Sequence, residues 1–173
     1  LIQHEKNNPN KLIQLFILNW RKSMDFIVEK DPGLIPQVLS NILDSCVNGI
    51  TLADPDQEDL PLVYANKAFE TITGYTQAET IGKNCRFLQG NDRDQQERYQ
   101  LREAILNKKS IEITIRNYRK NGEMFYNHLV ITPLFDSKGN LLYYLGVQFD
   151  VTQQKKAEEE IKRLTEQLAK LSK

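Results

Sequence analysis

The segment from residue 111 to residue 150 limits most strongly how this chain can fold. Isoleucines alternate with polar residues over 111–116, which is the period of two expected for a strand with one buried face. An Asn-Gly pair at 121–122 predicts a two-residue hairpin turn, after which residues 125–134 return antiparallel. Residues 141–150 carry apolar or aromatic side chains at odd and at even positions, so both faces of the strand are apolar, as expected for a central strand. The segment therefore predicts three antiparallel strands.

Upstream of these strands, the pattern predicts a hairpin followed by short helices. Strand-like segments at 50–53 and 62–65 flank a polar loop. Asn66 is placed to cap a helix, a further turn of helix is expected at 77–81, and a longer helix at 95–107. We therefore expect an α+β fold, with a five-stranded antiparallel sheet and short helices on one face.

Helical patterns flank this core on both sides. Apolar residues spaced four and three apart run through 11–30, a second short helix is expected at 34–44, and an a/d pattern covers about three heptads within 151–172. The last pattern fits either a coiled coil or a helix folded back on its own sheet. Two apolar seams favour a homodimer, joined in parallel through the last helix. The predicted organisation is an N-terminal helical extension at 1–47, a core domain at 48–150 and a C-terminal linker helix at 151–173.

Composition excludes several functions. Lys+Arg and Asp+Glu both number 23, so no net field favours nucleic acid or an anionic membrane. No apolar run approaches the roughly 20 residues that span a bilayer.

The two cysteines, Cys46 and Cys85, are expected to be free thiols in a reducing cytoplasm. His4 and His128 are the only histidines, so no metal site, catalytic triad or enzymatic activity is predicted. The chain begins with Leu and ends inside a helical pattern, so we expect a fragment without its effector domain.

The stretch at 82–90 concentrates groups that bind ligands. It reads Gly-Lys-Asn-Cys-Arg-Phe-Leu-Gln-Gly and carries a thiol, a guanidinium and two carboxamides between two glycines. Taken alone, Cys85 could equally be a small buried hydrophobe of the core.

The stretch at 82–90, together with its surroundings, resembles the signature of the light-oxygen-voltage (LOV) branch of the PAS superfamily. The resemblance covers about 49–150 without an obvious gap. Its other matching residues are Leu62-Val63-Tyr64-Ala65-Asn66, Thr73-Gly74-Tyr75, Asn117-Tyr118, Gly122, Phe125, Asn127, Pro133, Gly139 and Gly146-Val147-Gln148. It implies a PAS fold and a blue-light sensory module that binds FMN, is not itself an enzyme and regulates an effector.

The resemblance also implies a role for particular residues. Cys85 matches the thiol that bonds reversibly to the flavin C4a carbon in light, and Gln148 matches the switch whose amide reorients when flavin N5 is protonated. Arg86 and Gln89, with Arg102 one helix later, match the phosphate ligands, and Arg93 and Arg98 could assist. Asn84, Asn117 and Asn127 match the amides at the polar edges of the flavin. The other expected cofactor-binding residues are Thr51, Leu88, Ile105, Ile115, Leu129, Ile131, Tyr144 and Gly146.

The chain departs from the family pattern at three positions. Ala53 stands where many members have a hydroxyl residue, Leu60 replaces a common Asn, and Thr51 replaces a common Val or Ile. We expect these differences to tune the lifetime of the adduct. Cys46 precedes the resemblance and is given no role. The alternative reading is a PAS module for dimerisation and for sensing flavin redox state or another small ligand.

Overall fold

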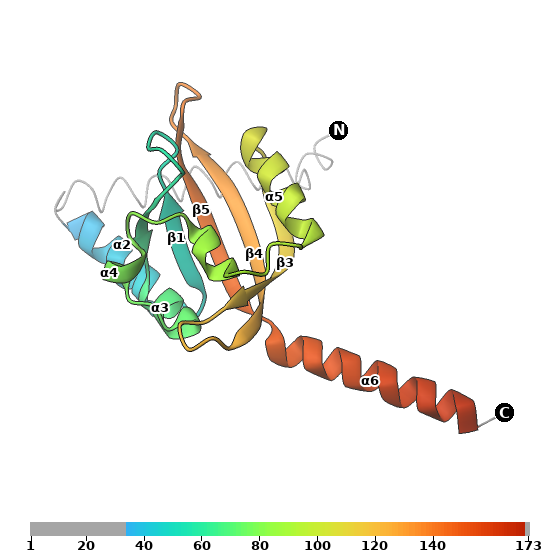
Figure 1. Ribbon diagram of the computed structural model, residues 1–173. Helices are drawn as coiled ribbons and strands as arrows, with labels where there is room; N and C mark the ends of the chain where they lie inside the picture. Colours follow the sequence, from blue (N-terminus) through green and yellow to red (C-terminus); the bar gives the residue numbers. More distant parts are fainter. Residues whose placement is uncertain (1–33, 172–173) are drawn as a thin grey trace, which may run out of the picture. The chain divides into compact units, whose positions relative to one another are not determined.

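The computed structural model describes residues 34–171 of the chain, which falls into two compact units, Leu1–Ser45 and Cys46–Lys173 (Figure 1). The described part of the first unit is helix α2, Leu34–Ser45, close to the helix predicted at 34–44. The predicted amphipathic helix at 11–30 lies outside the described residues. All the remaining elements belong to the second unit.

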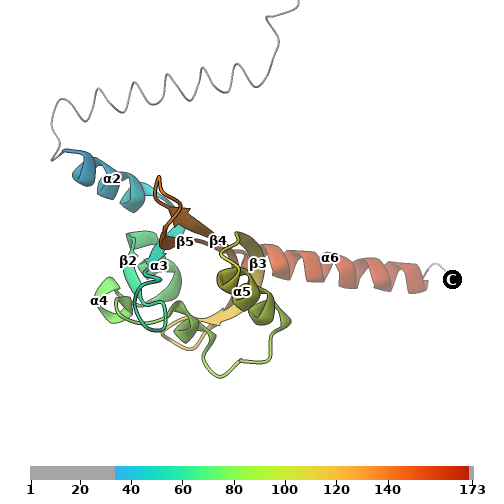
Figure 2. The ribbon, with the colours of Figure 1, turned by 90° about the horizontal axis from the view of Figure 1, so that it is seen from above.

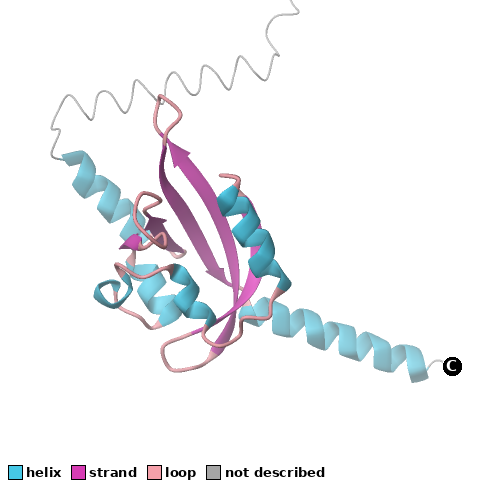
Figure 3. Cartoon of the chain, turned by 45° about the horizontal axis from the view of Figure 1, so that its top comes forward, coloured by secondary structure: helices cyan, strands magenta, loops and turns pink. Residues whose placement is uncertain are grey.

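The second unit is built on one antiparallel sheet with the order β2-β1-β5-β4-β3 (Figure 3). The strands are β1 (Gly49–Ala53), β2 (Leu62–Ala65), β3 (Ile111–Tyr118), β4 (Met124–Phe135) and β5 (Leu141–Asp150). The last strand lies in the centre, between β1 and β4. The α+β class, the five strands and the central position of 141–150 are therefore confirmed.

Short helices connect β2 to β3 and gather on one side of the sheet (Figure 2). They are α3 (Lys67–Thr73), α4 (Gln77–Thr80), the 3₁₀ helix η1 (Cys85–Gln89) and α5 (Gln96–Leu106). The Asn66 side chain accepts a hydrogen bond from Phe69 N at 3.0 Å and one from Ile50 N at 2.8 Å. The predicted cap therefore also ties the start of α3 to β1.

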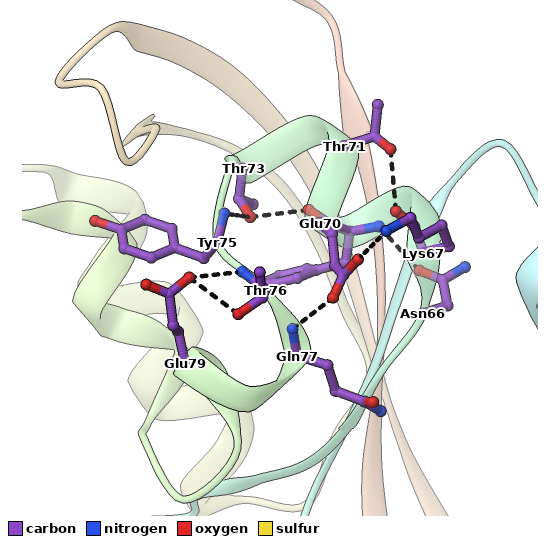
Figure 4. A network of polar contacts seen from close by, with 10 residues as sticks. Asn66, Lys67, Glu70, Thr71, Thr73, Tyr75, Thr76, Gln77 and Glu79 are labelled. Atoms are coloured by element: carbon purple, nitrogen blue, oxygen red, sulfur yellow. Dashed lines mark hydrogen bonds and ion pairs between the residues drawn. The ribbon is translucent and has the colours of Figure 1, made fainter.

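The turn between α3 and α4 is held by carboxylates that accept backbone N–H bonds (Figure 4). Glu79 accepts from Thr76 N at 2.9 Å, and Glu70 accepts from Gln77 N at 2.6 Å. Carboxylates at helix N-termini satisfy donors that the helix itself leaves unpaired. These bonds fix the direction in which the chain enters the stretch at 82–90.

A small apolar core anchors η1. Leu62, Ala65, Phe69 and Leu88 are buried together, and backbone bonds from Leu62 N to Lys83 O (2.9 Å) and from Gly82 N to Leu62 O (2.8 Å) bind the same stretch to β2. Burial of large apolar side chains is the main source of folding free energy. The position of Cys85 is thus set by packing on one side of η1.

Helix α6 (Thr152–Leu171) begins directly after β5 and runs for 20 residues (Figure 1). Its apolar residues Ile161, Leu164 and Leu168 are 65%, 46% and 67% exposed, so the seam is not folded back onto the sheet of the same chain. Within residues 34–171 no helix is both long and apolar enough to span a membrane.

Candidate functional site

A cavity of about 630 Å³ lies among the sheet, η1, α5 and the 54–61 loop, a volume typical of small-molecule and cofactor sites. It is where the separate sequence predictions meet. With one exception, every expected site residue lines it: Thr51, Asn84, Cys85, Arg86, Gln89, Arg102, Ile105, Ile115, Asn117, Asn127, Leu129, Ile131, Tyr144, Gly146 and Gln148.

Leu88 is the exception. It is 1% exposed, packs in the core cluster with Leu62, Ala65 and Phe69, and is not among the residues lining the cavity. Cys85 and Gln89, at the two ends of the same 3₁₀ helix, do line it. Because a short helix packed on the core must turn some side chains inward, Leu88 anchors η1 to that core.

The strand positions that face the cavity follow the predicted alternation. Ile115 pairs with Asn127 across β3 and β4, and Leu129 pairs with Gln148 across β4 and β5. Residues two apart on a strand share a face, so apolar and amide side chains form one continuous wall. Gly146 adds no side chain to this wall.

Gly146 is required by a close approach. A Cβ atom placed there would lie 2.6 Å from Thr51 Oγ1 of the neighbouring strand β1. Such a separation is shorter than real Cβ contacts tolerate, so the Thr51 side chain would have to shift. The Thr51 and Gly146 positions therefore act as a pair.

We expect Gly146→Ala to destabilise the fold by about 1–3 kcal/mol through overpacking and to weaken ligand binding. The double change Thr51→Ala/Gly146→Ala removes the clashing hydroxyl and should recover most of both losses. Urea unfolding of the two variants and the parent measures the effect. Equal losses in the single and double variants would contradict the assignment of the clash to Thr51.

Three amides form a buried chain across β3, β4 and β5. Asn127 Nδ2 donates to Asn117 Oδ1 and to Gln148 Oε1, both at 2.9 Å. All three side chains are at most 4% exposed. Asn127 Oδ1 is buried with no hydrogen-bond partner in the described part of the chain, and so is Gln89 Oε1. Since buried polar atoms are nearly always paired, a bound ligand or ordered water is expected to donate to these two oxygens.

Cys85 lies at the cavity wall next to the amide chain. Gln148 Nε2 donates to Cys85 Sγ at 3.9 Å, a long contact typical of sulfur acceptors. Burial raises the pKa of the Cys85 thiol to about 12, against a smaller lowering by the Gln148 hydrogen bond. The thiol is therefore protonated at neutral pH, which argues against a thiolate nucleophile of the usual enzymatic kind.

The mouth of the cavity is strongly basic. Arg86, Arg93, Arg98 and Arg102 all line it, and the last two come from α5. Arg93 Nε donates to Gly90 O at 2.9 Å, and an Arg98 guanidinium nitrogen donates to Arg93 O. Guanidinium groups bind phosphate with paired, charge-assisted hydrogen bonds. The mouth therefore suits an anionic group at the end of the ligand.

Several lining residues were not predicted as site residues. Asp59 and Leu60 come from the loop between β1 and β2, and Leu62, Leu101 and Leu106 complete the apolar lining. Tyr144 was expected to contact the ligand, but its hydroxyl also donates to Ile105 O at 2.7 Å and joins β5 to α5. The apolar side of α5 explains why that helix has no fully buried residue: it faces the cavity.

Comparisons with known proteins identify the family of the chain. Residues 47–153 match the PAS domain family. A blue-light photoreceptor of Listeria innocua is 42% identical over 124 residues, which cover 72% of this chain and 49% of that protein. The LOV domain of the blue-light activated histidine kinase of Erythrobacter litoralis EL346 has 45% identity and a TM-score of 0.58, covering 61% of this chain and 96% of that one.

An RNA-binding light-oxygen-voltage receptor has 39% identity and a TM-score of 0.71, covering 78% of this chain and 38% of that receptor. The chain spans about half the length of the Listeria photoreceptors that it matches. The shared part is the PAS core, including the strands and helices that enclose the cavity. The chain belongs to the PAS domain family and, within it, to the LOV domains of blue-light sensory proteins.

Proposed function

We propose that the cavity binds FMN and that the chain senses blue light through a reversible bond between Cys85 and the flavin. Bound FMN would supply the absorption of blue light and, at its C4a carbon, the acceptor for the Cys85 sulfur. The proposal rests on one observation: the Cys85 thiol, the buried amide chain and two acceptor oxygens without partners in the described residues all belong to residues that line the cavity. In this proposal the chain is a sensory module and not an enzyme.

The residues present fit a flavin nucleotide. Asn127 Oδ1 and Gln89 Oε1 are buried acceptors without partners in the described residues, as needed for the N–H donors of a flavin ring or for ribityl hydroxyls. Ile115, Leu129 and Ile131 provide an apolar surface for a planar aromatic system. Arg86 and Arg102 would hold the phosphate, with Arg93 and Arg98 adding positive charge at the mouth.

Cys85 needs little activation in this scheme. Its position on a rigid 3₁₀ helix, with Asn84 Oδ1 accepting from Arg86 N at 2.9 Å, holds the sulfur against the cavity before any reaction. Prior positioning of a reacting atom accounts for much of the rate of such steps. The neutral thiol supplies both the sulfur and the proton.

We expect the yield of the light-driven bleach to stay constant between about pH 6 and about pH 9, because burial raises the pKa of the Cys85 thiol to about 12. A yield that rises with a midpoint near neutral pH would contradict a protonated thiol.

The raised pKa of Cys85 also makes folding stability depend on pH in one direction. The free energy of unfolding keeps its full value below the ordinary thiol pKa of 9.0 and falls as the pH rises towards about 12. In that range the unfolded chain loses the thiol proton while the folded chain still keeps it.

Gln148 would carry the signal out of the cavity. It is 1% exposed and links Cys85 to Asn127. A change at the Cys85 thiol that reverses the Gln148 amide must rearrange the hydrogen bonds of Gln148 to Cys85 and to Asn127. Gln148 lies on β5, the strand that leads into α6. A bistable hydrogen-bond pattern of this kind can bias a distant element.

The junction from β5 to α6 is tightly connected. Asp150 Oδ1 accepts from Thr152 N at 2.9 Å, Tyr126 N donates to Thr152 Oγ1 at 2.9 Å, and Arg119 forms an ion pair with Asp150. We propose that a shift of β5 changes the geometry of α6, whose exposed seam joins two copies of the chain as a homodimer and regulates an effector.

Absorption spectroscopy tests the proposed function. The purified protein should be yellow, with a structured blue band that bleaches under blue light and returns in darkness. If flavin-free protein takes up no FMN, the proposal fails. A flavin that is bound but only reduced, without a reversible bleach, would favour flavin redox sensing instead.

A further inference from the structure

We propose that Asp59 sets the preference of the cavity for a phosphorylated flavin, because its carboxylate competes with the ligand's phosphate for Arg86. This inference rests on the proposed function. It assigns a role to a residue that the sequence pattern did not single out, in a loop outside the motif at 82–90.

Asp59 is placed at the mouth of the cavity. Its Oδ1 lies 2.5 Å from Arg86 Nη1, and the side chains of Asp59 and Arg86 are 57% and 47% exposed. Of the described residues that line the cavity, Asp59 alone has an acidic side chain, and four arginines line it too. The carboxylate of Asp59 is therefore paired with the guanidinium of Arg86, the residue directly after Cys85.

The loop holds Asp59 in place. Asp59 and Leu60 both have left-handed backbones, with φ of 68° and 51°, which is uncommon for residues other than glycine and persists only when the surroundings impose it. Asn84 Nδ2 donates to Asp59 O at 2.5 Å, and Asp54 N donates to Pro61 O at 3.0 Å across the base of the loop. The carboxylate is therefore positioned by the fold.

A phosphate group arriving at Arg86 meets this carboxylate. A guanidinium has five donors, so Arg86 can contact both anions, but they would then lie about 5–6 Å apart and repel each other. A phosphate monoester carries about −1.5 to −2 charges at pH 7. Repulsion of this size in a water-exposed site changes a binding constant by roughly fivefold and is screened by salt. Riboflavin, which lacks the phosphate, is not affected.

The test compares Asp59→Asn with Glu58→Gln. Asparagine tolerates the left-handed conformation, so the loop should keep its shape while the charge is lost. Glu58 is exposed, belongs to the same loop and does not line the cavity, so its change removes the same charge without touching Arg86. Flavin-free protein is titrated with FMN and with riboflavin at low and at high salt, and bound flavin is measured by fluorescence.

We expect Asp59→Asn to raise the ratio of FMN affinity to riboflavin affinity on the order of fivefold at low salt, and less at 1 M salt, where the Debye length is about 3 Å. Glu58→Gln should change the ratio by less than about twofold, because an exposed charge that does not contact Arg86 is largely screened. Weaker FMN binding, or an equal change for both flavins, would show that Asp59 positions Arg86 and would overturn the inference.

Failure of the proposed function would look different. A parent protein that binds neither flavin removes the basis of both proposals. A parent protein that binds FMN, combined with an unchanged ratio in Asp59→Asn, overturns only the role of Asp59. Asp59→Gly, which removes the charge and suits the left-handed backbone, serves as a second variant and should raise the ratio in the same direction.

Discussion

Cys85→Ala should bind flavin as the parent protein does and lose the reversible bleach completely. Cys85 is one of many residues lining the cavity, so its removal leaves the amide chain, the apolar wall and the arginines in place. No other thiol lines the cavity, since Cys46 is outside the lining. The absorbance of the blue band before, during and after illumination measures the effect.

Cys46→Ala is the matched control for Cys85→Ala. Neither cysteine forms a disulfide in the described part of the chain, so a loss of bleaching in the Cys85 variant alone assigns the chemistry to the cavity. Persistence of a normal bleach and dark recovery in Cys85→Ala would refute the role of this thiol. Equal loss in both variants would point to a general effect of thiol removal.

Gln148→Leu should uncouple the cavity from α6. Leucine has a similar size but cannot accept from Asn127 or donate to Cys85, so two bonds at the centre of the wall are lost. Asn127 Nδ2 keeps its bond to Asn117, which limits the destabilisation to about 1–3 kcal/mol. We expect flavin binding and bleaching to remain, while most of the light-dependent change in α6 disappears.

The measurement for Gln148→Leu is the distance between spin labels on an exposed α6 position in the two copies of a homodimer. Glu159 is exposed, and its side chain forms no hydrogen bond or ion pair with any residue of the described part of the chain, so it can carry the label. A light-induced change of the same size in parent and variant would argue against Gln148 as the relay. An unfolded variant would show itself by loss of the bound flavin.

The sequence was most informative where local rules apply. The alternation of isoleucines at 111–116 and the Asn66 cap depend on neighbours that are close in the chain, and both formed as expected. The Asn-Gly pair does lie in the β3–β4 turn, but the turn is wider than the predicted two residues: the strand pairing ends at Tyr118 and Met124, and Gly122 N donates to Arg119 O at 2.9 Å. The central place of β5 also followed from its apolar residues on both faces. For the site, the amides and Cys85 that the resemblance singled out all line one cavity, and their roles stay predictions.

Leu88 and Asp59 show where sequence reasoning ended. Both belong to loops or short helices in which no period of two or of 3.6 residues indicates which way a side chain faces. Leu88 faces the core because Leu62, Ala65 and Phe69 meet it there. The Asp59 to Arg86 pair joins residues 27 positions apart, and it depends on two left-handed residues that no turn motif predicted.

By itself, the sequence determined the elements, their antiparallel order and the residue types of the site, since these follow from local propensity, alternation and a family signature. Only the tertiary structure decided which groups meet: the clash that requires Gly146, the two acceptor oxygens left without partners, and the acidic residue among four arginines. The physical reason is that a cavity is a property of packing between distant segments. Its shape and charge arise only when the sheet and the helices come together.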